Sequence, residues 1–385
     1  MKTTFSISLR LLSTFCVALW VCAAAQAQAP VTTSFSANGV LVCSNLAPGS
    51  LATVEWASSL SGPWTNNWAG LDAVAVGASG MIQVSVPMFY RVLGVAYTIN
   101  TTTSDGMVLV PAGSFTMGDA NDGNASYDAP THTVNVSAFY MDTNLVSYTF
   151  WQQVYQWAET NGYSFDNAGA GKAASHPVQT VNWYDVVKWC NARSEMAGST
   201  PCYYTNSSLS QVAIYRSGTF DLATNWVNWV ANGYRLPTEA EWEKAARGKL
   251  SGQRFPWGDT ISESQANYYG DTTDYNYDLG PAGFNAAFAT GGYPYTGPVG
   301  CFAPNGYWLY GMAGNVSQWC WDWYSGAYYS SSPGTDPRGA ASGAHRVVRG
   351  GSWLFDASHT RCANRDSNLP TYADYYFGFR CVRGS

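Results

Sequence analysis

The stretch "GYRLPTEAEWEKAARG", residues 233–248, carries the clearest local structural signal in the chain. Pro237 precedes Thr238, and Glu241 follows Thr238 by three residues, which is the spacing of a capping box at a helix N-terminus. Gly248 ends the run where a helix C-cap is expected. The stretch therefore predicts a short helix whose two ends are both set by local residues.

Two further helices are expected before it. In "SYTFWQQVYQWAETNG", Phe150, Val154 and Trp157 recur at i, i+4 and i+7, which predicts one apolar stripe. In "NWYDVVKWCNARSEMAG", Asn182 is a capping residue and Gly198 ends the pattern. Gly, Asn, Tyr and Trp dominate elsewhere. The remaining part of this domain is therefore expected to consist of loops and short strands packed by aromatic side chains.

The beginning of the chain has the order of an export signal. Residues 1–27 run from a basic start through an apolar stretch to small residues, which is typical of a cleaved secretory signal and too short for a membrane anchor. Residues 31–98 show period-2 patterning between Gly and Pro turns, which predicts a small all-β module. Residues 99–106 have a linker's composition, and 107–385 form a second domain. A secreted or periplasmic location without a membrane anchor follows as an expectation.

The composition limits the class of partner. Without Lys2 and Arg10, 17 basic residues face 25 acidic ones, so the expected mature chain has a formal charge of −8. Such a balance argues against nucleic acid as a partner. Seven cysteines follow the signal, and an exported chain permits disulfides between them. The odd count leaves at least one thiol unpaired in a monomer.

The motifs of the second domain, taken together, resemble one known family. They include "MVLVPAGSFTMGD" (107–119), "HTVNVSAFYMD" (132–142), "HPVQTVNWYDVVKWCN" (176–191), "GYRLPTEAEWEKAARG" (233–248), "RFPWGD" (254–259), "PVGCFAPNGYWLYGMAGNVSQWCWDWY" (298–324), "RVVRGGSW" (346–353) and "GFRC" (378–381). This series is similar to the formylglycine-generating enzymes, also called the sulfatase-modifying factor family. The resemblance implies an α+β fold of low regular secondary structure, related to C-type lectins.

The resemblance also implies where an oxidase site would lie. Active members hold copper(I) with two cysteines shortly after the RGGSW motif, since soft thiolates select this soft ion. Here Phe355 stands at the position of the first cysteine, and the segment is too short to carry the second. Copper is therefore not expected, and no catalytic residue is assigned. His359 and Cys362 form an H-x-x-C pair, which is a weak metal signal because it supplies only two ligands.

Other cysteines match structural positions of the family. The resemblance implies a disulfide between Cys190 and Cys381. The family partner of Cys362 would fall at Ala246, which has no sulfur. Cys362 is then either free or paired with one of the cysteines that the family does not predict, namely Cys202, Cys301 and Cys320.

Calcium is a possible cofactor on the same ground. Asn267 and the Tyr268 carbonyl match one family site, but Gly291 occupies the position of its carboxylate. At a second site, Gly311 and Gln318 replace an Asn and a Glu. Because a hard cation prefers anionic oxygen, both sites are expected to be weak. A nearby acidic loop either restores one site or is simply solvated, and its carboxylates are Asp271, Asp274 and Asp278.

The function expected from these observations is binding by a protein that has lost the oxidase chemistry. The expected contact surface is the segment 353–376, whose mixture of rings and charges suits stacking on a ring or hydrogen bonding to a peptide. Its candidate binding residues are Trp353, Asp356, His359, Arg361, Arg365, Tyr372, Tyr375 and Tyr376. The plain structural alternative is that several of them, above all Arg361 and Arg365, only anchor the loop.

Two rival hypotheses stay open at this point. One is a formylglycine-generating oxidase that acts on a sulfatase cysteine with a non-standard metal site. The other is a retroelement-diversified binding protein of lectin-like fold, in which the same C-terminal segment is the variable contact surface. The ligand in the binding hypotheses is an unidentified peptide, protein or glycan.

Overall fold

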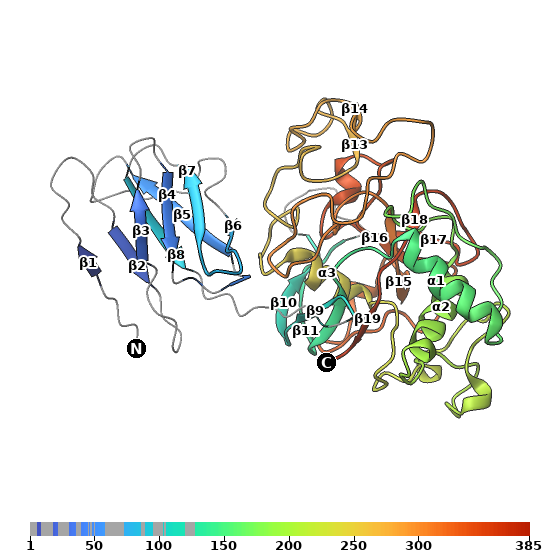
Figure 1. Cartoon of the computed structure of the whole chain (residues 1–385). Helices are drawn as coiled ribbons and strands as arrows, with labels where there is room; N and C mark the ends of the chain where they lie inside the picture. Colours follow the sequence, from blue (N-terminus) through green and yellow to red (C-terminus); the bar gives the residue numbers. More distant parts are fainter. Residues whose placement is uncertain are drawn as a thin grey trace. The chain divides into compact units, whose positions relative to one another are not determined.

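The computed structural model divides the chain into two compact units, residues Met1–Asn100 and Thr101–Ser385 (Figure 1). In the second unit it describes residues 103, 105–119 and 128–385. In the first unit the described segments are 6–8, 18–21, 31–35, 40–44, 46, 48–49, 51–57, 73–85 and 89–94. Most of the predicted signal peptide and of the predicted linker lies outside the described residues, so both stay predictions.

The described segments of the first unit form two sheets in which most strand pairs are antiparallel. Their strand orders are β1-β2-β8-β5-β6 and β3-β4-β7. The strands are β1 (Ser6–Ser8), β2 (Ala18–Val21), β3 (Val31–Phe35), β4 (Val40–Ser44), β5 (Leu51–Ala57), β6 (Val74–Ala75), β7 (Ile82–Ser85) and β8 (Phe89–Gly94). The unit is thus all-β where it is described.

The second unit distributes its strands over four small sheets. Their orders are β10-β11, β19-β12-β9, β13-β14 and β17-β16-β15-β18. The strands are β9 (Met107–Val110), β10 (Gly113–Met117), β11 (His132–Val136), β12 (Phe139–Asp142), β13 (Tyr269–Gly270), β14 (Gly283–Phe284), β15 (Ser317–Trp323), β16 (Arg346–Arg349), β17 (Asp366–Asn368), β18 (Phe377–Gly378) and β19 (Val382–Gly384). Because β12 pairs with both β9 and β19, one sheet joins the two ends of the unit.

Three α-helices and four short 3₁₀ helices complete the described part of this unit. They are α1 (Tyr148–Thr160), α2 (Trp183–Met196), α3 (Glu239–Arg247), η1 (Gln211–Ala213), η2 (Thr224–Trp226), η3 (Tyr328–Ser330) and η4 (Ala357–Thr360). All three predicted α-helices are present. The predicted α+β class with little regular secondary structure is confirmed. No helix in the described part of the chain is long and apolar enough to cross a membrane.

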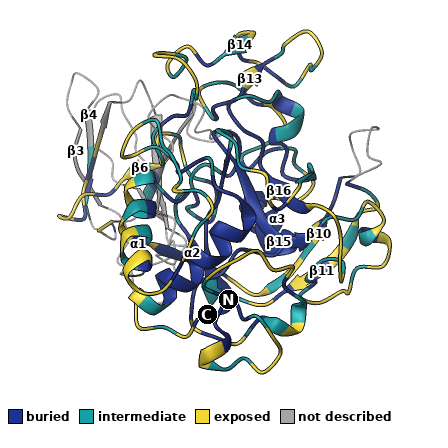
Figure 2. Cartoon of the chain, turned by 90° about the vertical axis from the view of Figure 1, so that its right-hand side faces the viewer, coloured by how far each residue is buried: buried dark blue, intermediate teal, exposed yellow. Residues whose placement is uncertain are grey.

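Helix α3 begins and ends as its sequence predicts. The Thr238 hydroxyl accepts from the Glu241 backbone N–H at 3.2 Å, and the Glu241 carboxylate accepts from the Thr238 N–H at 2.8 Å. Gly248 closes the helix with a left-handed φ of +56°. Every residue of the helix is buried, and Figure 2 shows α3 beside β15 and β16 in the interior.

Helix α1 forms where it was predicted, and its predicted apolar stripe packs on the core. Trp151, Val154 and Ala158 are buried, whereas Phe150 and Trp157 are only partly so. The Trp151 ring lies parallel to Trp189 of α2 at 5.6 Å, and Trp151 Nε1 donates to a loop carbonyl. Packing against α2 therefore decides which of the helix's many aromatic residues faces the core.

Candidate functional site

The turn that follows β16 positions the candidate site. Gly350 and Gly351 have φ angles of +88° and +63°, a region that favours glycine. A Cβ at Gly350 would lie 2.9 Å from the Trp242 ring, and one at Gly351 would lie 2.9 Å from the His359 backbone. The turn therefore requires both glycines, and Trp353 follows it as a fully buried side chain.

Trp353 contacts four other aromatic rings. We call this group the aromatic cluster, and its members are Phe284, Tyr293, Tyr295, Trp353 and Tyr375. The four other ring centroids lie between 5.2 and 5.7 Å from that of Trp353. Such distances are typical of favourable aromatic pairs. The cluster joins β14 and the loop after it to the C-terminal segment that the sequence had marked as a binding surface.

Part of the aromatic cluster faces solvent. Tyr293 is 59% exposed, and its ring lies nearly parallel to Tyr375 at 6.1 Å. Tyr372, which is 39% exposed, lies further along the same segment and donates to Asp374 at 2.9 Å. Exposed rings held by buried ones form a pre-organised platform for another ring or an apolar group.

Sequence reasoning missed three residues of the cluster, Phe284 of β14 and Tyr293 and Tyr295 of the loop that follows it. The signal that would have found the two tyrosines is "GGYPYTGP", residues 291–298, where they lie among Gly and Pro. Binding residues are often carried on loops, so tyrosines in such a turn-rich stretch are candidates for contact.

The same C-terminal segment carries a partly exposed histidine. His359 Nδ1 is 2.8 Å from an Asp366 carboxylate oxygen, and its ring lies 4.9 Å from that of Phe355. The hydrogen bond to Asp366 raises the pKa of His359 above its ordinary value, although burial acts against this. Asp356 is the N-cap of η4 and accepts from the Ser358 N–H at 2.8 Å. His359 thus offers polar contacts, whereas Asp356 is occupied by the backbone.

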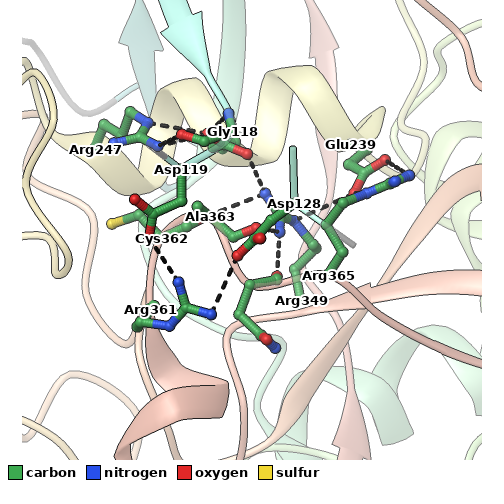
Figure 3. Close-up of polar contacts among 12 residues, drawn as sticks. Gly118, Asp119, Asp128, Glu239, Arg247, Arg349, Arg361, Cys362, Ala363 and Arg365 are labelled. Atoms are coloured by element: carbon green, nitrogen blue, oxygen red, sulfur yellow. Dashed lines mark hydrogen bonds and ion pairs between the residues drawn. The ribbon is translucent and has the colours of Figure 1, made fainter. Parts of the chain in front are cut away.

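Arg361 and Arg365 form ion pairs with buried carboxylates, the arrangement that the anchoring alternative expects. The Arg361 guanidinium lies 2.7 Å from Asp119 and 3.1 Å from Asp128 (Figure 3). The Arg365 side chain has no exposed surface and forms a two-pronged pair with Glu239 at 2.7 and 2.8 Å. Because buried charges need partners, both arginines hold the C-terminal segment to the rest of the unit through these carboxylates.

The residues near the RGGSW turn do not fit copper(I). Phe355, at the position of the first family cysteine, packs its ring against His359 and Tyr376. Cys362 is 1% exposed, and burial raises the pKa of its thiol to about 12. Because copper(I) is held by accessible thiolates, Cys362 does not replace the missing pair.

Cys190 and Cys381 are neighbours in the core. Their sulfur atoms lie 3.5 Å apart as buried thiols, on α2 and directly before β19. Burial raises the pKa of Cys190 well above its ordinary value. The disulfide between them stays a prediction, and the structure supplies the adjacency that it requires.

Side chains at the two calcium positions bind other protein groups. Asn267 donates to the Tyr295 carbonyl at 2.8 Å. The Gln318 side-chain oxygen accepts from Trp242 at 2.9 Å and from Arg380 at 2.8 Å. These contacts fit a calcium ion poorly, because the oxygen of Gln318 is neutral and already shared.

The acidic loop is likewise closed on itself. Asp278 accepts from the backbone N–H groups of Asp271 and Gly280 at 2.7 and 3.0 Å and from the Tyr268 hydroxyl. Asp271 in turn accepts from the Asp274 N–H at 3.1 Å. Within the described residues no group of three or more His, Cys, Asp or Glu side chains is placed to hold a metal ion. Weak calcium binding stays a prediction of the sequence.

Comparison with known proteins identifies the family to which this chain belongs. Residues 94–385 match the profile of the "Sulfatase-modifying factor enzyme 1-like domain". The chain belongs to this family. A formylglycine-generating enzyme of Streptomyces coelicolor is 35% identical over 297 residues, which is 72% of this chain and 88% of that protein.

Other proteins that are similar to this chain carry different names. The chaperone protein LppX of Paenibacillus barcinonensis is 32% identical over 262 residues, which is 66% of this chain and 81% of that protein. The solved structure of Treponema denticola variable protein 1 is 29% identical with a TM-score of 0.55, and the match covers 72% of this chain and 95% of that one. Membership of the family therefore sets the fold without setting the activity.

Proposed function

We propose that this sulfatase-modifying factor family member is an exported binding protein for a peptide, protein or glycan and has no oxidase activity. The observation that carries the proposal is the aromatic cluster, with its exposed Tyr293 and partly exposed Tyr375, beside a turn where Phe355 replaces a copper ligand. The order of residues 1–27 supports export.

The chemistry of the surface favours a ligand with a planar or apolar face and polar substituents. Stacked tyrosines offer flat apolar surface at a low cost in side-chain entropy, and their hydroxyls add hydrogen bonds. His359, which is paired with Asp366, lies across Phe355 and supplies a further donor. A sugar ring or an aromatic peptide side chain meets these requirements.

We expect the purified protein to convert no cysteine of a sulfatase-type peptide to formylglycine when copper(I) is added. The reason is the absence of an accessible thiolate pair after Trp353. Mass spectrometry of the peptide after incubation with oxygen and reductant provides the measurement, with an active formylglycine-generating enzyme as the positive control. Stoichiometric copper binding with peptide turnover would instead support the rival oxidase hypothesis.

Ala substitution of Tyr293 and Tyr375 together is expected to weaken a bound glycan or peptide at least about tenfold, because each stacked ring contributes roughly 1 kcal/mol. Glycan and peptide arrays identify the ligand, and calorimetry compares the variants. Adding Tyr372→Ala tests the remaining exposed tyrosine of the segment. Tyr155→Ala on α1 is the matched control, since it removes a partly buried tyrosine elsewhere.

Two results would defeat the binding proposal. One is that no ligand on the arrays binds the parent protein and the double variant is unfolded, because the rings would then have only a structural role. The other is that Tyr155→Ala weakens binding as much as the double variant does. Equal melting temperatures with loss of ligand only in the double variant would support it.

A diversified contact surface is a second candidate within the binding proposal. The similarity to Treponema denticola variable protein 1 favours it, as does the exposed ring of Tyr372 beside the partly exposed Tyr375 and Tyr376 in the C-terminal segment. Comparison of residues 353–376 among strains of the source organism tests this idea. Near-identical segments in every strain would contradict the hypothesis of a diversified contact surface.

A further inference from the structure

A hollow of about 430 Å³ lies beside the C-terminal end of α3. One side is formed by Ser114 and Thr116 of β10 and Thr133 of β11, and Thr116 and Thr133 are direct cross-strand partners. The other side is formed by α3 and the turn that follows it. None of the described lining residues belongs to the aromatic cluster, so the hollow is a separate feature.

The hollow concentrates positive charge on an acidic protein. Lys244, Arg247 and Lys249 line it, and no carboxylate is among the described lining residues. The whole chain carries a formal charge of −6. Field lines converge in a concave site lined by one sign of charge, so the hollow attracts anions more strongly than the protein's net charge suggests.

Two of these cations are held rigidly. Lys244 Nζ donates to the carbonyls of Pro111 at 2.7 Å and Gly113 at 2.8 Å, groups that do not neutralise its charge. Arg247 pairs with Glu243 at 2.8 Å, but Glu243 is shared with a second arginine, Arg349. Both cations therefore contribute a fixed positive field without having to rearrange.

The groups that would touch a ligand lie at the rim. Lys249 is exposed and its Nζ lies 5.3 Å from the Tyr307 ring centroid. The hydroxyls of Ser114, Thr116, Thr133 and Ser251 are exposed and take no side-chain hydrogen bond in the described part of the chain. Phe115 and Leu250 add apolar surface to the same hollow.

We propose that this hollow binds a small ligand in which a phosphate or sulfate monoester is attached to a ring. Hydroxyl donors and an ammonium group suit a tetrahedral oxyanion. The volume of the hollow falls within the range of small-molecule sites and is larger than a bare phosphate or sulfate ion requires. The apolar lining can therefore contact the ring of the ligand. The site goes beyond the binding surface at the aromatic cluster and does not depend on it.

Calorimetric titration of the full chain with glucose 6-phosphate and glucose 6-sulfate tests the proposal, with glucose, inorganic phosphate and inorganic sulfate as comparisons. At least one ester is expected to bind saturably, more weakly at higher salt because exposed charges are screened. The ester that binds shows whether the site prefers a phosphate or a sulfate group. Glucose alone is expected not to bind, and the inorganic ions are expected to bind about tenfold more weakly than the ester.

Lys249→Asn is the decisive variant, because Lys249 has a φ of +77° and Asn tolerates this region. It is expected to weaken ester binding about tenfold, whereas Lys172→Asn, which removes the same charge elsewhere, leaves it unchanged. Thr133→Val removes a rim hydroxyl on a strand and keeps the test valid if the first variant fails to fold. Absence of saturable ester binding, or equal affinity in parent and both hollow variants, would overturn the proposal.

Discussion

Replacement of Glu243 by Gln is expected to lower the free energy of unfolding by about 3–5 kcal/mol. The Glu243 side chain is fully buried and accepts from Arg247 at 2.8 and 3.0 Å, from Arg349, and from the Gly118 N–H at 2.9 Å. Burial alone would raise the pKa of Glu243, but the two arginines lower it below its ordinary value. The carboxylate is therefore ionised, and a neutral amide would leave two buried guanidinium groups without their shared counter-charge.

Chemical denaturation of the parent protein and the variant measures this loss. Glu159→Gln on α1 makes the same chemical change at an exposed position and is expected to shift stability by less than about 0.5 kcal/mol. A loss below about 1 kcal/mol in Glu243→Gln would show that Glu239, which also lies near Arg349 at 3.7 Å, compensates for the missing charge. That result would contradict the central role assigned to Glu243.

Oxidation is expected to join Cys190 to Cys381 and to stabilise the second unit by about 4–5 kcal/mol on the chain-entropy treatment. The sulfur atoms already lie 3.5 Å apart in the core. The bond would close a long loop between α2 and the last strand, which removes many conformations from the unfolded chain. Mass spectrometry of a non-reduced digest identifies the linked peptides, and denaturation with and without reductant gives the energy.

Cysteine variants separate this bond from the packing of the cluster. In Cys190→Ser the difference between oxidised and reduced stability is expected to vanish. In Cys202→Ser, a change at another buried cysteine, it is expected to persist. Alkylation of Cys190 or Cys381 in folded, oxidised protein would show that the pair stays reduced.

The candidate site was predictable only in part. The sequence indicated the C-terminal segment and the loss of the copper position at Phe355. It left open whether Arg365 contacts a ligand or only anchors the loop, and the structure buries Arg365 under the segment and exposes Tyr372 on it. Both residue types suit a binding surface, and only their partners distinguish anchor from contact.

The sequence by itself determined the three α-helices, the family and the absence of a cysteine at Phe355. Helix limits were readable because caps such as Thr238 and Gly248 act on backbone groups within one turn. The tertiary structure alone decided which faces of α1 are buried and which loops meet. Trp353 meets Tyr293 across 60 residues of chain, and Arg361 meets Asp119 across 242. Such contacts depend on the packing of whole segments, so no local pattern of residues encodes them.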